Sequence, residues 1–278
     1  MTSSFVTSTA RIFELSLGQI LWARRTLFLA MLAGGPVLLA LATRLAFSSG
    51  AAMVRVNGAT VDSATIFNVA IWTLYLRFIV PALGVFYGAS LIADEVEDKT
   101  ITYLFTRPIR RAAVVLGKYL AYLMHVTATV LPSVAILFAL MVPFGNMAVI
   151  YVTLVKDLGV IALGLAAYGA LFLLAGVALK RPLVAGLVFA FGWEQLAIAM
   201  PGYLRYLTIA YYLKALAPQA IPIEDTPMAR ESVFSILQVF NTNLPSAAGS
   251  VMTLGLVVTV ALVLAMRTVE RREYVLEQ

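Results

Sequence analysis

Long apolar runs alternate along the chain with short stretches that hold most of its charge. A transmembrane helix needs about 20 mostly apolar residues to cross about 30 Å of hydrocarbon. Six runs meet this requirement, and they predict spans over Leu27–Phe47, Ile66–Ile92, Val114–Val142, Leu158–Leu179, Leu183–Met200 and Ala247–Met266. The fold class expected is therefore an all-α polytopic membrane protein with a single transmembrane domain over residues 1–278.

Two further segments are too apolar for solvated loops. Residues 8–25 place Arg11 and Glu14 on one helical face and Ile12 and Leu15 on another, which predicts an interfacial helix in the cytoplasmic headgroup plane. Residues 201–246 contain a tyrosine group, from Tyr203 to Tyr212, that is typical of the headgroup region. They predict two short external helices, re-entrant or interfacial, before the sixth span, the second of which would run from Asp225 to Phe240.

Composition supports the membrane class and excludes some chemistry. The chain is 62% hydrophobic, with a mean hydropathy of +0.93. It has no cysteine and one histidine, His125, which excludes thiolate sites and multi-histidine metal clusters. A net charge of +6 would indicate nucleic acid in a soluble protein, but here the bases flank the apolar runs, so we expect no nucleic-acid partner.

The distribution of the basic residues predicts the orientation. With the N-terminus inside, thirteen Lys and Arg residues lie in internal segments and six in external ones, and one, Arg77, falls within a span. Cytoplasmic loops carry an excess of Lys and Arg. We therefore expect a multi-pass protein with both termini and the segment after the second span in the cytoplasm.

That segment, residues 93–112, is the main functional candidate. The region 89–121 holds nine of the 34 charged residues of the chain. The residues singled out are Asp94, Glu95, Glu97, Asp98, Thr100, Arg107, Pro108 and Arg111. Such a cluster beside a membrane favours docking of a soluble partner. Other interpretations are a solvated face, acids that cap the next helical turn, and bases that hold anionic lipid headgroups.

The chain lacks an energy source of its own. A phosphate-binding loop needs G-x-x-x-x-G-K-[ST], but Gly117-Lys118 is followed by Tyr119, and Ala112 stands where the first glycine should be. No hydrolase or metalloprotease motif appears either. We expect no ATP site, no cofactor, no metal and no catalytic residue in this chain.

Two charges fall inside predicted spans. Arg77 and Glu194 lie at similar depths, about 22 Å and about 18 Å from the cytoplasmic ends of their helices. An unpaired charge at that depth costs about 3 kcal/mol or more, so each needs a partner or a wet cavity. The two residues are expected either to line or gate a translocation pathway or to form a buried ion pair. Spacing also places Arg77, Pro81, Gly84 and Gly88 on one face of the second span, which we expect to point into the bundle and not to lipid.

The charged segment resembles the signature of type-two ABC transporter permeases, the six-span exporter subunits that work with a separate ATPase. The family pattern is E-x-x-x-G-T-[LI]-x-x-L, then P-[IV]-x-R, then G-K-x-L. The matching residues here are Glu95, Thr100-Ile101, Leu104, Pro108-Ile109, Arg111 and Gly117-Lys118-Tyr119-Leu120. Lys99 departs from the pattern, which usually has glycine there.

The resemblance implies a permease subunit of an ABC exporter in the prokaryotic cytoplasmic membrane. Its partners would be a cytoplasmic ABC ATPase that binds ATP and Mg²⁺, a second permease copy in a homodimer or related heterodimer, and membrane lipids. The segment after the second span would be the coupling helix. Alternatives from the residues alone are a secondary transporter or channel, and a non-transporting membrane anchor of a larger complex.

Overall fold

The computed structural model describes residues 5–21, 25–48, 55–56, 59–60, 63–97, 110–141, 147–199, 203–217 and 244–271. Two helices come first, α1 (Phe5–Leu21) and α2 (Arg25–Ser48). A two-stranded antiparallel hairpin follows, formed by β1 (Arg55–Val56) and β2 (Ala59–Thr60). The rest of the described chain is helical.

The next helical path runs from Ser63 to Glu97, and two π-helical segments interrupt its α-helix. Its pieces are α3 (Ser63–Ala70), the π-helix η1 (Ile71–Ile79), α4 (Val80–Leu83), the π-helix η2 (Gly84–Gly88) and α5 (Ser90–Glu97). Pro81 has no backbone N–H to donate, which breaks the regular hydrogen-bond ladder. Directly before it, the Val80 N–H donates to the Tyr75 carbonyl, a wide π-type bond.

The chain from Arg111 onward contains the two longest helices and several short ones. These are α7 (Arg111–Met141), α8 (Met147–Ala178), α9 (Pro182–Leu187), the π-helix η3 (Val188–Trp193), α10 (Glu194–Ala199), the 3₁₀ helix η4 (Tyr203–Leu207), α11 (Ile209–Leu216) and α13 (Ala247–Arg271).

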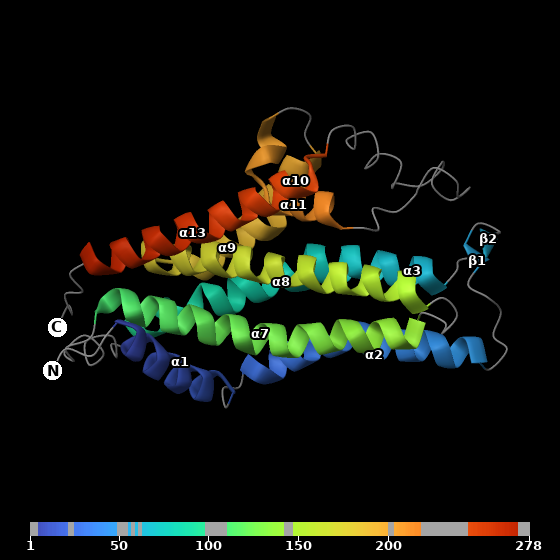
Figure 1. Ribbon diagram of the computed structural model, residues 1–278, viewed down its shortest axis with the longest axis horizontal. Coiled ribbons are helices and arrows are strands. Elements are labelled where there is room, and N and C mark those ends of the chain that lie inside the picture. Colours follow the sequence, from blue (N-terminus) through green and yellow to red (C-terminus); the bar gives the residue numbers. More distant parts are fainter. Residues whose placement is uncertain are drawn as a thin grey trace.

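The helices form an elongated bundle around α7 and α8, which lie side by side (Figure 1). Helix α7 also contacts α1, α2 and α13, whereas α8 contacts α13, α9 and the π-helix η2. Helix α1, the start of α7 and the end of α13 share one end of the bundle, and α3 lies toward the other end (Figure 1). Helices α10 and α11 pack together, and α11 contacts α13 near its start (Figure 1).

Five helices are long and apolar enough to cross a membrane. They cover Arg25–Leu45, Phe67–Glu95, Arg111–Met141, Tyr151–Ala178 and Ala247–Arg271. The fifth predicted span corresponds to a shorter apolar helix, Pro182–Ala197. An all-helical core of this kind, with five long apolar helices, belongs to a polytopic membrane protein.

The outer faces of the bundle are apolar. Met31 on α2 and Met252 on α13 are 77% and 75% exposed, and Leu38 is 68% exposed. A soluble monomer rarely exposes contiguous apolar patches of this extent. These side chains are suited to contact with lipid.

Glycine allows α8 to approach its neighbours closely. A methyl group on Gly84 would lie 2.6 Å from the Tyr168 Cβ, and one on Gly88 would lie 2.9 Å from the Gly169 carbonyl oxygen. A methyl group on Gly176 would collide with the Ala89 carbonyl. Because lipid is as apolar as leucine, small residues and close packing hold membrane helices together. The sequence-based expectation that Gly84 and Gly88 point into the bundle is confirmed.

Several element boundaries differ from those predicted. Helix α8 begins at Met147, eleven residues before Leu158, because backbone hydrogen bonding continues through the polar residues Lys156 and Asp157. Helix α1 ends at Leu21, and Arg25 begins α2 instead of ending the first helix. The helix expected over Asp225–Phe240 lies outside the described residues.

The contact face of α1 also differs from the apolar face expected. It buries Ser8, Thr9, Ile12 and Ser16, whereas Leu15 is 66% exposed. A methyl group on Gly117 of α7 would lie 2.9 Å from both the Ile12 side chain and the Thr9 carbonyl oxygen. The helix therefore packs on α7 through small residues and leaves its leucine outside, as is common for helices in lipid.

Candidate functional site

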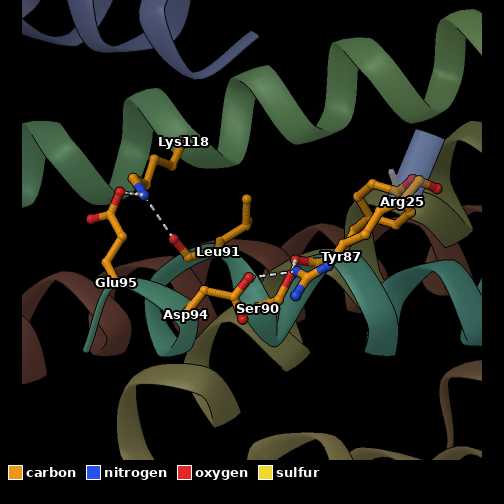
Figure 2. Close-up of polar contacts among 7 residues, drawn as sticks. All are labelled: Arg25, Tyr87, Ser90, Leu91, Asp94, Glu95 and Lys118. Carbon is orange, nitrogen blue, oxygen red and sulfur yellow. Dashed lines mark hydrogen bonds and ion pairs between the residues drawn. The ribbon is translucent and has the colours of Figure 1, made fainter. Parts of the chain in front are cut away.

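The candidate site lies at the end of α5, where two adjacent acids point to two different neighbouring helices (Figure 2). The Asp94 Oδ2 lies 2.5 Å from the Arg25 Nη1 at the start of α2. The Glu95 carboxylate accepts a hydrogen bond from the Lys118 ammonium on α7. Successive residues on a helix point in directions about 100° apart. The end of α5 can therefore contact both α2 and α7 through adjacent residues.

The Lys118–Glu95 pair is the more buried of the two. The Lys118 and Glu95 side chains are 9% and 20% exposed, whereas those of Arg25 and Asp94 are 50% and 37% exposed. The Lys118 Nζ also donates to the Leu91 carbonyl at 2.9 Å. In soluble proteins, removing one partner of a buried pair costs about 3–5 kcal/mol, whereas an exposed pair contributes about 0–1 kcal/mol.

Tyr87 adds a second link between the helical path and α2, and Ser90 bonds to Tyr87 within the path (Figure 2). The Tyr87 hydroxyl donates to the Arg25 carbonyl at 2.6 Å, and the Ser90 hydroxyl donates to the Tyr87 carbonyl at 3.1 Å. The Thr26 hydroxyl in turn donates to the Ile20 carbonyl of α1 at 2.6 Å. Helices α1, α2 and α7 are therefore all connected to the helical path that ends at Glu97.

A cavity of about 380 Å³ opens among these helices. Its lining combines the four charged residues with side chains of α1 and of the helical path: Ser16, Gln19, Ile20, Arg25, Tyr87, Ser90, Leu91, Asp94, Glu95 and Lys118. The ion pairs of α5 therefore line a cavity between α1, α2 and α7.

The predicted site residues are thus only partly described. Asp94 and Glu95 pair with basic residues of the same chain. The sequence did not predict this pairing, because its pattern indicated that the acids contact a soluble partner or cap a helix. The Arg111 Nη1 donates to the Val269 carbonyl of α13 at 3.4 Å. Glu97 ends α5, but its side chain is not described. Asp98, Thr100, Arg107 and Pro108 lie outside the described residues.

Sequence reasoning missed the roles of Arg25, Tyr87 and Lys118. Lys118 had one signal, since it belongs to the G-K-x-L pattern. Arg25 counts in the sequence only as one of the internal basic residues that predict the orientation. A pattern along the chain does not show that two helices 23 or 69 residues away meet at one point, because that depends on the packing.

A second polar group lies toward the opposite end of the bundle. The Arg77 Nε donates to the Gln195 Oε1 at 2.8 Å, and its Nη2 donates to the same oxygen. The Glu194 side chain is 1% exposed and accepts hydrogen bonds from the Tyr168 hydroxyl and, at 2.9 Å, from the Ile209 N–H. In this structure Arg77 and Glu194 do not pair with each other.

The physical reason is the direction in which α10 presents its side chains. Gln195 faces Arg77, and Glu194, about 100° around the helix, faces Tyr168 and the first turn of α11. A carboxylate at a helix N-terminus satisfies free N–H groups and is favoured by the helix dipole. Glu194 therefore anchors α11 to α10, and Arg77 is left with a neutral partner.

Both residues lie at π-helical segments. Arg77 lies within η1, and η3 ends at Trp193, directly before Glu194 and Gln195. Segments of π-helix are rare and occur frequently at functional sites. The widened turns also explain why Arg77 does not follow Gly84 and Gly88 onto the face toward α8, since the predicted alignment assumed 3.6 residues per turn throughout.

In the part of the chain that the structure describes, no group of three or more His, Asp or Glu residues is placed to hold a metal ion. His125, which lies 6.0 Å from Tyr87 between ring centroids, is buried within the bundle.

The fold and the site define a class: a multi-span membrane protein whose main polar cluster lies at one end of the bundle and connects several helices to a charged segment. The model of the ABC-2 family transporter proteins matches residues 9–274, almost the whole chain, so the chain belongs to that family. It is an ABC transporter permease, the membrane subunit, and membership implies association with an ABC ATPase. A comparison with curated proteins gave no match.

Proposed function

We propose that this permease is a six-span ABC exporter subunit of the prokaryotic cytoplasmic membrane, with both termini in the cytoplasm. In this assignment the fifth crossing is made by α9, η3 and α10, and the sixth by α13. Helix α1 lies at the cytoplasmic headgroups, and η4 and α11 lie on the outer side. Two permeases, in a homodimer or a related heterodimer, would work with two ATPase subunits that bind ATP and Mg²⁺.

We further propose that α5 and the segment up to residue 112 receive the ATPase and pass its movement into the bundle. The observation that carries this proposal is the double attachment of α5, through Asp94 to α2 and through Glu95 to α7. A displacement of α5 acts on both helices at once, and on α1 through Gly117 and the Thr26 contact. Glu97, Asp98, Thr100, Arg107 and Pro108 remain candidates for the surface that the ATPase contacts.

The test is to isolate the permease from its native membrane with its ATPase and to measure ATP turnover in reconstituted liposomes. We expect a stoichiometric complex. We expect Glu95→Gln to reduce the stimulation of ATP turnover by the reconstituted permease while the complex still assembles, because the amide keeps the shape but loses the ionic link to Lys118.

The matched control is Glu270→Gln, an exposed acid on α13 at the same end of the bundle. This variant should couple as the natural chain does. An uncoupling as large in Glu270→Gln as in Glu95→Gln would contradict the proposed path. A purified permease that binds no ATPase would contradict the assignment as a transport subunit.

A further inference from the structure

Arg77 is a cation without a carboxylate partner among the described residues. It lies inside the apolar helix Phe67–Glu95, it is partly exposed, and its hydrogen bonds to described residues end on the neutral amide of Gln195. The nearby acid, Glu194, accepts hydrogen bonds from the Tyr168 hydroxyl and from the Ile209 N–H at the start of α11. An amide fixes the direction of a guanidinium but does not neutralise its charge.

A second cation lies in the same region. The Lys214 Nζ of α11 lies 6.0 Å from the centroid of the Trp72 ring, and Trp72 and Arg77 are five residues apart in η1, about one π-helical turn. Burial lowers the pKa of Lys214, and the charge of Arg77 lowers this pKa further. Two positive side chains are therefore close enough to repel each other beside a half-buried tryptophan.

The surroundings are apolar and accessible. Phe78, next to Arg77, is 49% exposed, and Leu196, next to Gln195, is 58% exposed. Phe78 also packs on Phe191, with ring centroids 5.6 Å apart. In the proposed orientation, Arg77 lies 17 residues from Asp94, about 25 Å at the α-helical rise, and therefore in the outer half of the bilayer.

We propose that Arg77, oriented by Gln195 and assisted by Lys214, binds the phosphate or carboxylate group of an anionic amphipathic substrate whose apolar part lies against Phe78 and Leu196. This inference deepens the proposed function, on which it rests, by assigning a substrate class. A guanidinium presents several donors in one plane and binds phosphate and carboxylate groups in a two-point manner. Its remaining donors supply the attraction, and the Gln195 bonds hold the group in place before the substrate arrives.

The experiment measures binding to the full chain without its ATPase, in nanodiscs of zwitterionic phosphatidylcholine. The probes are dodecyl phosphate, inorganic phosphate, dodecyl maltoside and dodecyltrimethylammonium, with partition into empty nanodiscs subtracted. The natural chain should bind dodecyl phosphate saturably and more tightly than the neutral and cationic probes. Weak competition by inorganic phosphate would support a contribution from the apolar chain, whereas full competition would contradict the contact assigned to Phe78 and Leu196.

Variants at Arg77 separate charge from shape. We expect Arg77→Gln to bind dodecyl phosphate at least about tenfold more weakly, equivalent to about 1.4 kcal/mol. Arg77→Lys should bind with an affinity between those of Arg77→Gln and the natural chain, because an ammonium keeps the charge but lacks the planar set of donors. Arg44→Gln is the matched control, since Arg44 is another guanidinium of the bundle, bonded to the Ala139 and Leu140 carbonyls at 3.2 and 3.0 Å. It should bind as the natural chain does.

Two results would overturn this site: equal binding of dodecyl phosphate by Arg77→Gln and the natural chain, or a cationic probe that binds as tightly as the anionic one. Thermal melting of each variant shows whether a loss of binding comes from misfolding. If Arg77→Gln does not fold, equal binding of dodecyl phosphate by Arg77→Lys and the natural chain would overturn the two-point binding assigned to the guanidinium. Because no ATPase is present, a failed coupling experiment leaves this result standing. An intact, coupled complex without anion binding would overturn the site alone.

Discussion

The ion pairs of α5 differ most in burial, and this difference predicts unequal effects of two neighbouring substitutions. Glu95→Ala leaves the Lys118 ammonium, almost enclosed, without its carboxylate, and we expect a loss of about 3–5 kcal/mol of stability. Asp94→Ala leaves Arg25 half exposed to solvent, and we expect a loss of at most about 1 kcal/mol. Thermal melting in detergent compares the two. A larger shift for Asp94→Ala would show that the α2 contact, and not the α7 contact, dominates.

A charge exchange at Arg77 and Glu194 tests the separate partners of these residues. If they formed an ion pair, Arg77→Glu with Glu194→Arg would restore what each single change destroys. In the structure Glu194 instead accepts a hydrogen bond at the N-terminus of α11. An arginine at this position would be repelled by the positive end of the helix dipole. We therefore expect the double variant to be at least as unstable as Glu194→Arg alone, by the same melting measurement. Recovery of stability would show that the two residues pair in the membrane.

At the scale of the elements, two glycines of one helix should respond in opposite ways to the same substitution. Gly176→Ala would drive a methyl group into the Ala89 carbonyl and separate α8 from the Phe67–Glu95 helix, with a loss of about 1–3 kcal/mol or more. Gly159→Ala meets nothing within 4 Å and gains up to about 1 kcal/mol from helix propensity. The melting temperatures of the two variants check this. Equal shifts would mean that close packing at Gly176 does not hold these helices together.

The elements also show where a sequence pattern succeeds and where it fails. Apolar length located the long helices because each must satisfy its backbone internally within lipid. It failed at their ends, since α8 extends through Lys156 and Asp157, where the polar side chains do not stop backbone hydrogen bonding. It also failed within the Phe67–Glu95 helix, where π-helical turns rotate Arg77 relative to a regular helix. Pro81 was the one local signal of this change.

At the scale of the whole molecule, the proposed topology is open to a direct test because the chain has no native cysteine. Tyr203→Cys, at a position that is 87% exposed, should be labelled from outside intact cells by a membrane-impermeant maleimide. Arg271→Cys, at the exposed last residue of α13, should be labelled only after permeabilisation, because the end of α13 lies at the end of the bundle that holds α1. Both residues lie at helix ends, so neither substitution disturbs the core. Labelling of Tyr203→Cys only after permeabilisation, with Arg271→Cys labelled from outside, would contradict a crossing by α9, η3 and α10.

By itself the sequence determined that this protein is built of membrane helices, roughly where they lie, and that its charged segment follows the second of them. These properties are local, because hydrocarbon imposes a length and a composition on each helix separately. The family pattern is local as well, and it gave the class that the family comparison confirmed.

Only the tertiary structure decided which charges meet. In the structure Asp94 pairs with Arg25, and Glu95 pairs with Lys118. Arg77 donates to Gln195, whereas Glu194 accepts a hydrogen bond from the first turn of α11. The partner of a side chain depends on the rotation and closeness of whole helices. In this bundle both depend on contacts between small residues and on changes of helical winding, and no spacing along the chain expresses either of them.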